Sequence, residues 1–293
     1  MSIDQLASLY EAGGHHVVRC GRNYWYSASP RIYQNLPPSE PVSPTSREVD
    51  ELFRSSKLTG IQFPTELSTG ILCGRFVLSD KAYSLASAQP QFRQHVRKGL
   101  QKCTVREIGF DELRKIGMPV NLDAMRRREY AVPCFVDPKL WANFCIAGEK
   151  IEGAGAIGSF VSGTLAAYLI YAVISGTCYG LHMMSRFDMR AHKPNHCLYF
   201  TFADKMINRS DLEMVTTGLH SLHKTRGIDD FKRHAGFKLE TCNVGVVLRP
   251  SARMLLANPV SRLSLAGASR LLKKPHLDRL HQVVQIATKT VLS

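Results

Sequence analysis

The sequence contains no apolar run long enough to cross a bilayer. The stretch from Leu165 to Ile174 is shorter than the roughly 20 residues that a membrane-spanning helix needs, and Gly176 follows it closely. The first residues, Met1 to Gln5, also lack the basic start and long apolar run of a secretory signal peptide. From these two absences we expect a cytoplasmic protein.

Cysteines at metal-binding or redox spacing are missing too. The 8 cysteines are scattered singly through the 293 residues, with no Cys-x-x-Cys motif and no Cys/His group at zinc spacing. We therefore expect reduced, mostly buried thiols and no metal site. The apolar content of 44% is enough for an ordinary buried core.

Acidic residues are scarce beside basic ones. The chain has 24 Asp and Glu against 38 Lys and Arg, which gives a formal net charge of +14. Such an excess favours an anionic partner, namely nucleic acid, a phosphorylated cofactor or an acidic membrane face. The alternative is that the positive charge only keeps the protein soluble.

The dinucleotide-binding fingerprint is absent in its required context. Gly153, Gly155 and Gly158 have the Gly-x-Gly-x-x-Gly spacing, but they precede a predicted strand. The fingerprint needs these glycines to follow a strand and open a helix, where the pyrophosphate binds. We therefore exclude a dinucleotide site here.

The stretch from Gly153 to Phe237 organises the rest of the chain. Alternation and helical periodicity predict strands over 155–163, 164–175, 177–185 and 213–222, and helices over 196–208 and 229–236. A basic connection, Arg186 to Asn195, leads from the third strand into the first helix. Cationic and amide side chains at a helix N-terminus favour phosphate or carboxylate binding.

Further basic clusters lie outside this stretch. Arg93 and Arg97 are four residues apart on one face of a predicted helix, where their repulsion would be relieved by a bound anion. Arg126-Arg127-Arg128 forms another cluster. The alternative for the first cluster is an ordinary solvated helix surface.

The chain after Pro250 combines many basic and apolar residues with a single acidic one, Asp278. Pro259 and Pro275 divide it into short predicted helices. A basic amphipathic helix can lie on an anionic bilayer or on RNA. Packing against the main domain is the alternative, and we favour it for 277–286.

The order of these elements resembles that of the GNAT acyltransferase superfamily. Lys193-Pro194-Asn195 before the helix and Phe231-Lys232-x-x-x-Gly236-Phe237 near the end are similar to motifs of its Fem-type branch. Members of that branch transfer amino acids from aminoacyl-tRNA to peptidoglycan precursors, or acylate other amines. The resemblance covers about residues 90 to 248 and implies an α/β (α+β) fold, with a mixed, mostly antiparallel sheet flanked by helices.

The resemblance also implies a domain organisation. Fem-type proteins carry two GNAT-like units, so residues 1–88 are expected to form a truncated GNAT-like unit and residues 89–250 the acyltransferase domain. Residues 251–293 are then a basic helical tail.

The family's donor site implies that the strands over 177–185 and 213–222 diverge and hold an acyl donor between them. The donor-binding residues would lie in the connection that follows, and they are Arg186, Arg190, Lys193, Asn195 and His196. Acetyl-CoA users usually carry glycines here, whereas this chain has Arg-Phe-Asp-Met-Arg-Ala over 186–191. The donor is therefore expected to be an acyl-CoA held differently or an aminoacyl-tRNA, unless the site is inactive.

The acceptor amine must lose a proton as it attacks, which requires a general base or a desolvated pocket. His182 on the third strand, with Tyr179 nearby, is the first candidate and His220 is the second. Strict alternation would place Tyr179 and His182 on opposite faces of the strand. A hydrogen-bonded core histidine is the alternative for His182.

Six further residues are expected to contact substrate, unless they belong to ordinary surface segments; they are Arg93, Arg97, Lys224, Arg226, Asp230 and Lys232. The whole pattern predicts an N-acyltransferase that moves an acyl or aminoacyl group from CoA or tRNA to an amine, with possible peripheral contact at the inner face of an anionic membrane. The alternative is a noncatalytic GNAT-like protein whose basic groove binds RNA or another anion.

Overall fold

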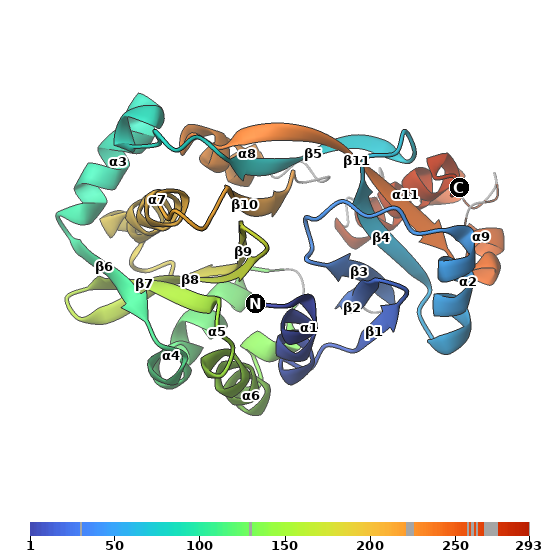
Figure 1. Ribbon diagram of the computed structural model, residues 1–293, viewed down its shortest axis with the longest axis horizontal. Coiled ribbons are helices and arrows are strands. Elements are labelled where there is room, and N and C mark those ends of the chain that lie inside the picture. The colour runs from blue at the N-terminus through green and yellow to red at the C-terminus, as the bar shows by residue number, and fades with distance from the viewer. Residues whose placement is uncertain are drawn as a thin grey trace. The chain divides into compact units, whose positions relative to one another are not determined.

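The computed structural model describes residues 1–29, 31–128, 131–220, 226–256, 258, 261, 263–266 and 275–292 (Figure 1). The chain forms two compact units. The first consists of Met1–Gly14, Phe76–Gly218 and Thr225–Leu239, and the second of His15–Arg75, Leu219–Lys224 and Glu240–Ser293. Compact units and family units need not coincide, so the GNAT-like unit boundaries at residues 88 and 250 stay a prediction.

The sheet of the first unit has the strand order β10–β9–β8–β7–β6. All neighbours are antiparallel except β10, which pairs with β9 in parallel. The predicted mixed, mostly antiparallel sheet is confirmed. Its strands are β6 (Cys103–Ile108), β7 (Ala154–Val161), β8 (Thr164–Ile174), β9 (Thr177–Ser185) and β10 (Met214–Leu219).

Helices cover both faces of this sheet, with α7 on one side of β7 and β8 and α4, α5 and α6 on the other (Figure 1). The α6 helix begins as its sequence predicts, because the Asp137 side chain accepts hydrogen bonds from the N–H groups of Lys139 and Leu140, at 2.8 and 3.2 Å. The helices are α1 (Ile3–Ala12), α3 (Pro90–Leu100), α4 (Phe110–Ile116), α5 (Met118–Arg126), α6 (Pro138–Glu149), α7 (Pro194–Ile207) and α8 (Arg226–His234), with short 3-10 turns at Leu85–Ser87, Pro133–Phe135 and Arg190–His192.

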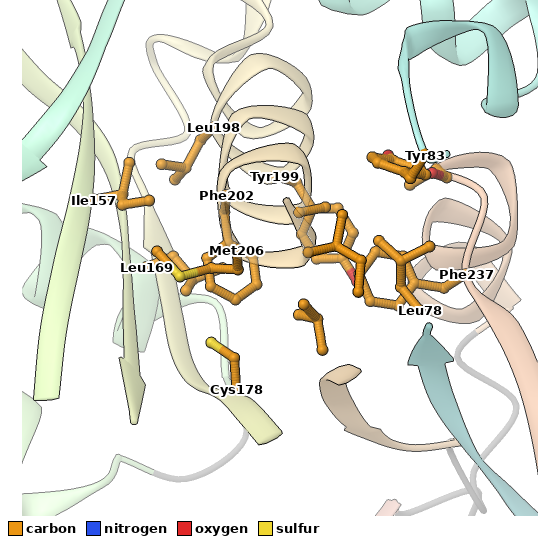
Figure 2. Packing of buried hydrophobic residues seen from close by; sticks show 14 of the residues in the cluster. Leu78, Tyr83, Ile157, Leu169, Cys178, Leu198, Tyr199, Phe202, Met206 and Phe237 are labelled. Carbon is orange, nitrogen blue, oxygen red and sulfur yellow. The ribbon is translucent and has the colours of Figure 1, made fainter. Parts of the chain in front are cut away.

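The core of the first unit fixes α7 against the sheet. Figure 2 shows Leu198, Tyr199, Phe202 and Met206 of this helix facing side chains from the strands, among them Leu169 of β8. Full burial of a large apolar side chain contributes about 1.5–3 kcal/mol. The first turn of α7, where the donor site is expected, therefore starts from a rigid helix.

The other end of α7 is held by a lysine from outside the helix. Lys81 Nζ donates hydrogen bonds to the carbonyl oxygens of Ile207 and Arg209, at 2.8 and 2.9 Å, and to that of Leu212. The last carbonyls of a helix have no partner within the helix, and a cation there also interacts favourably with the helix dipole. We expect Lys81→Met to lower the free energy of unfolding by about 1–2 kcal/mol, measured by urea denaturation.

A matched control for that measurement is Lys205→Met. Lys205 also lies in the last turn of α7, but it makes an exposed ion pair with Glu107 at 2.8 Å. Exposed pairs of this kind contribute roughly 0–1 kcal/mol. Equal losses in the two variants would contradict a capping role for Lys81.

The second unit has the strand order β1–β2–β3–β4–β11. β3 and β4 are parallel, whereas the pairs β1–β2, β2–β3 and β4–β11 are antiparallel. Both β5 and β11 have residues in each unit. The elements are β1 (Val17–Cys20), β2 (Asn23–Ser29), β3 (Ile32–Leu36), α2 (Ser46–Ser55), β4 (Gly60–Thr65), β5 (Ile71–Leu78), β11 (Lys238–Leu248), α9 (Pro250–Leu256) and α11 (Pro275–Lys289).

The helical tail packs in part. In α11, Ile286 and Ala287 are buried against Val246 and Leu248 of β11, which confirms the packing expected for 277–286. Much of the basic stretch before it, 267–274, lies outside the described residues. Within the parts of the chain that the structure describes, none of the helices combines the length and the apolar character that crossing a bilayer requires.

The cysteines have the burial expected from the sequence. All 8 are free thiols, and all except Cys73 are buried. Burial raises the pKa of several of them, Cys197 among them to about 12, so these thiols stay protonated and poorly reactive. Over the described residues, no group of three or more His, Cys, Asp or Glu side chains is arranged to hold a metal ion.

Candidate functional site

The parallel strands β9 and β10 separate partway along their length. They pair from Thr177 to Tyr179 on β9 and from Met214 to Thr216 on β10. Beyond this point β9 continues to Ser185 with an irregularity in its pairing to β8, because Gly180 and His182 have consecutive partners on β8 and Leu181 is skipped. Such a β-bulge bends a strand and increases its twist.

A cavity of about 440 Å³ lies where the two strands separate. We call it the strand-gap pocket. Strand β9 lines it along one side, and residues of β10, α7 and α8 line the remainder. Its lining consists of Arg128, Leu169, Gly180, Leu181, His182, Met183, Ser185, Asn195, Tyr199, Thr217, Gly227, Ile228, Phe231 and Lys232.

Lys232 supplies an unusual amine to the strand-gap pocket. Its Nζ donates a hydrogen bond to the carbonyl oxygen of Thr217 at 2.7 Å and lies 4.8 Å from the ring centre of Phe76. Burial lowers the pKa of Lys232 to about 8, and Asp229 opposes that shift. The same pocket holds a short hydroxyl pair, since Tyr199 Oη and Thr217 Oγ1 are 2.7 Å apart.

A second cavity of about 470 Å³ lies at the N-terminus of α7. We call it the basic pocket. It shares Ser185 and Asn195 with the strand-gap pocket, so the two are adjacent. Its lining consists of Arg127, Ser185, Arg186, Phe187, Arg190, Ala191, Lys193, Pro194, Asn195 and His196.

The basic pocket has more positive charge than its neighbouring carboxylates neutralise. Arg186 pairs with Asp188 at 2.6 Å and Arg127 with Asp123 at 3.2 Å. Among the residues that the structure describes, neither Arg190 nor Lys193 has a carboxylate partner. An anion in this pocket would therefore meet two cations that are not already paired.

The Lys-Pro-Asn motif shapes the entrance to α7. Lys193 has a left-handed backbone, with φ 59° and ψ 37°, and Pro194 follows in the first turn, where its missing N–H costs nothing. Asn195 Nδ2 donates to Ser185 Oγ at 3.2 Å and thereby ties the helix to the end of β9. Asn195 Oδ1 is buried and lacks a partner among the described atoms. The motif therefore brings the helix start and the end of β9 together.

His196 is a neutral member of the basic pocket. Its Nε2 lies 3.2 Å from Nδ1 of His95, and its ring packs between those of Phe92 and Phe231. Burial, with smaller contributions from His95 and Lys193, lowers the pKa of His196 to about 4. At neutral pH this side chain offers a hydrogen-bonding ring rather than a charge.

The β-bulge overturns the face assignment made from strict alternation. Tyr179 is opposite Ala172 and His182 is opposite Ile170, so the two side chains share one face of the sheet. The His182 ring lies 4.9 Å from that of Phe135 and 6.0 Å from that of Tyr10. Alternation alone had placed Tyr179 and His182 on opposite faces, and that expectation was wrong because Leu181 is an extra residue.

His220 lies apart from the other two candidates in the division of the chain. It belongs to the second unit, where its N–H donates to the carbonyl oxygen of Gly74 at 2.7 Å. It is not among the described residues that line either pocket. The roles of His182, Tyr179 and His220 as catalytic residues stay predictions.

Of the residues expected to contact substrate, Lys232 lines the strand-gap pocket. Arg93 donates to the carbonyl oxygens of Ala86 and Ala88, at 3.1 and 2.9 Å. Asp230 pairs with Arg233 at 3.3 Å. Arg97 is exposed on α3, and it lines neither pocket in the described part of the chain. Lys224 and the side chain of Arg226 lie outside the described residues.

The five residues expected to bind the donor, namely Arg186, Arg190, Lys193, Asn195 and His196, all line the basic pocket. Sequence reasoning missed Tyr199, which we had assigned to core packing, and Phe187. Tyr199 lies four residues after Asn195, so the two share a helix face, and that spacing was a usable signal. Arg127 was noticed only as part of a cluster, since nothing local connects it with residue 186.

No protein-family model matches the sequence, and no curated protein matches it in sequence. Solved structures are similar in fold. FemX matches with a TM-score of 0.57 and 11% identity, over 84% of this chain and 91% of FemX. The C-terminal domain of a putative lysylphosphatidylglycerol synthetase from Agrobacterium fabrum gives 0.56 and 13%, over 87% and 91%.

The structure of L-PGS from Bacillus licheniformis matches with a TM-score of 0.53 and 10% identity, over 90% of this chain and 92% of that one. At such identities the similarity concerns the fold. The chain therefore has the GNAT-like fold of Fem type that the order of its sequence motifs predicted.

Proposed function

We propose that this protein is an N-acyltransferase that moves an acyl or aminoacyl group from an anionic donor, an acyl-CoA or a charged tRNA, to an amine. The observation that carries the proposal is the separation of β9 from β10 beyond Tyr179, with one pocket in the gap and a cationic pocket beside it. A donor with phosphates in the basic pocket could pass its acyl carbonyl between Ser185 and Asn195 into the strand-gap pocket.

In this reaction the acceptor nitrogen attacks the acyl carbonyl carbon and forms a tetrahedral intermediate. The bond to the thiol sulfur or ribose oxygen of the donor then breaks, and the leaving atom takes up a proton. The negative charge that develops on the carbonyl oxygen needs a hydrogen-bond donor. Lys232 Nζ is the buried cation closest to this task, because it already lines the pocket and is held at Thr217.

The acceptor amine must be neutral when it attacks. His182 is our candidate base, with Tyr179 on the same face, and desolvation by the apolar lining, which includes Leu169, Met183 and Phe231, would also favour the neutral amine. His220 stays the second candidate. No carboxylate is found among the described residues that line the strand-gap pocket.

The acceptor could be a lipid or a lipid-linked amine at an anionic membrane surface. Two of the similar structures are named for lysylphosphatidylglycerol synthesis or as L-PGS. On this chain, Met254 and Leu255 of α9 are 74% and 70% exposed and follow Arg253. Exposed apolar side chains beside a cation suit peripheral binding to such a surface.

Ligand-dependent thermal stabilisation tests the proposal at its first step. A ligand that binds only the folded state stabilises it by about 2.7 kcal/mol at 100 times its dissociation constant. We expect acetyl-CoA, a longer acyl-CoA or an aminoacyl-tRNA to raise the melting temperature, and the same donor to give acylated product with an amine acceptor. If no donor shifts the melting temperature while uncharged RNA does, the enzyme proposal fails.

A noncatalytic protein that uses the basic pocket to bind RNA or another anion is the second candidate. The absence of glycines over 186–191 and of a carboxylate among the described lining residues favours it. Binding of uncharged RNA with no transfer from any donor would support this second function.

A further inference from the structure

Phe187 is an apolar ring exposed within a cationic pocket. It is 46% exposed, although the guanidinium of Arg190 lies over it, 3.8 Å from the ring centre. Arg127 lies farther away, at 5.5 Å. The Phe187 backbone is fixed as well, because its N–H donates to Asp123 Oδ2 at 2.8 Å. The ring is therefore held in place by neighbours at the pocket and not by burial in a core.

An aromatic ring with an arginine stacked on it, next to cations that can take phosphate, has the components of a nucleotide site. Bases stack on such rings through their π faces, while the cations attract the backbone. Arg186 and Lys193 line the same cavity, whose volume of about 470 Å³ is in the range of ligand pockets. Phosphate binding alone would give no reason to keep a large apolar ring exposed there.

We propose that Phe187, with Arg190 stacked on it, is the platform that binds the nucleobase of an adenine nucleotide, whose phosphates contact Lys193 and Arg186. This inference rests on the proposed function and identifies the part of the donor that the basic pocket recognises. The shared chemistry has two sources. Coenzyme A carries a phosphorylated adenosine diphosphate, and the 3′ end of tRNA is an adenosine.

Calorimetric titration of the full chain with adenosine 3′,5′-bisphosphate and with inorganic pyrophosphate separates base from phosphate recognition. We expect Phe187→Ala to weaken the nucleotide about 5- to 150-fold, as loss of one stacked base does, and to leave pyrophosphate affinity unchanged. Phe187→Leu, which keeps apolar bulk without a π face, should lose most of the same affinity. Phe187→Trp should keep it, and its added tryptophan should be quenched by the nucleotide.

Leu72→Ala is the control, since Leu72 is an apolar side chain that is 74% exposed and lies in the second unit. It should leave both affinities unchanged. Equal losses of nucleotide and pyrophosphate in Phe187→Ala, or full affinity in Phe187→Leu, would overturn the platform. So would a wild-type chain that binds the nucleotide no more tightly than pyrophosphate.

The source of the nucleotide is resolved by titrating CoA and a short RNA that ends in cytidine-cytidine-adenosine. Whichever binds should show the Phe187 dependence, and binding of either one without that dependence would refute the proposal. These titrations require no turnover. A chain that stacks the base on Phe187 but transfers no acyl group would refute the proposed function alone, whereas transfer that is indifferent to Phe187 would refute this inference alone.

Discussion

Replacing Lys232 with methionine is expected to reduce acyl transfer by about 10²- to 10³-fold in kcat/KM while making the fold more stable. Removing one preorganised donor to a developing oxyanion has an effect of this size in enzymes of related chemistry. The stability gain arises because burial holds the pKa of Lys232 at about 8 instead of 10.5.

The sign of the stability change follows from proton linkage. Below pH 8 the lysine is charged in both the folded and the unfolded state, and the folded protein bears the full cost of its buried charge. A shift of this size corresponds to about 3 kcal/mol, and loss of the bond to Thr217 offsets part of it. We therefore expect Lys232→Met to raise the free energy of unfolding by about 1–3 kcal/mol at pH 7, and by less as the pH rises above 8.

The measurements are steady-state transfer kinetics and urea unfolding of the same preparations. Lys205→Met on α7 is the control, because Lys205 is an exposed, ion-paired lysine, and it should leave transfer unchanged. Lys232→Arg should retain part of the activity but lose the decline in rate that wild type shows above pH 8. Lower stability together with intact transfer in Lys232→Met would assign this lysine a purely structural role.

Much of the fold was open to prediction because its signals are local. Apolar alternation located β7, β8 and β9 to within a residue or two, and the Lys-Pro-Asn motif marked the start of α7. Asp137 before a proline predicted the N-cap of α6 in the same manner. In each of these segments the residues that determine the structure are near neighbours in the chain.

The missed features depend on contacts between distant segments. Alternation counts every residue of β9, so it cannot detect that β8 pairs past Leu181 and brings Tyr179 and His182 to one face. Arg127 reaches the basic pocket because it donates to the carbonyl oxygen of Ser185, 58 residues later in the chain. Tyr199 fits a helical packing pattern equally well whether or not a gap opens between two strands beside it.

The donor site itself was predictable for a different reason. Its five expected residues lie in one continuous connection, and that connection folds back on the N-terminus of α7. Proximity in sequence therefore became proximity in space. The residues expected to contact the acceptor came from several separate segments, and of those that the structure describes only Lys232 lines a pocket.

Reversing both unpaired cations of the basic pocket, in the double variant Arg190→Glu and Lys193→Glu, is expected to weaken donor binding by about 30- to 1000-fold. Loss of a charge-assisted contact in a partly desolvated site, with a repulsive charge in its place, has a free-energy cost of about 2–4 kcal/mol. Neither side chain has a carboxylate partner among the described residues, so no native ion pair is broken. Stability should change little.

Arg97→Glu is the matched control, since Arg97 is an exposed cation on α3 of the first unit and is not among the described lining residues of either pocket. It changes the net charge in the same direction, and donor affinity should stay within about twofold of wild type at a Debye length of about 8 Å. Affinities would be measured by calorimetry over a range of salt concentrations. The double variant should also reduce the slope of log affinity against log salt by about 2, one for each lost phosphate contact. If Arg97→Glu weakens the donor as much as the double variant does, general positive charge attracts the donor, and the basic pocket loses its claim to be the donor site.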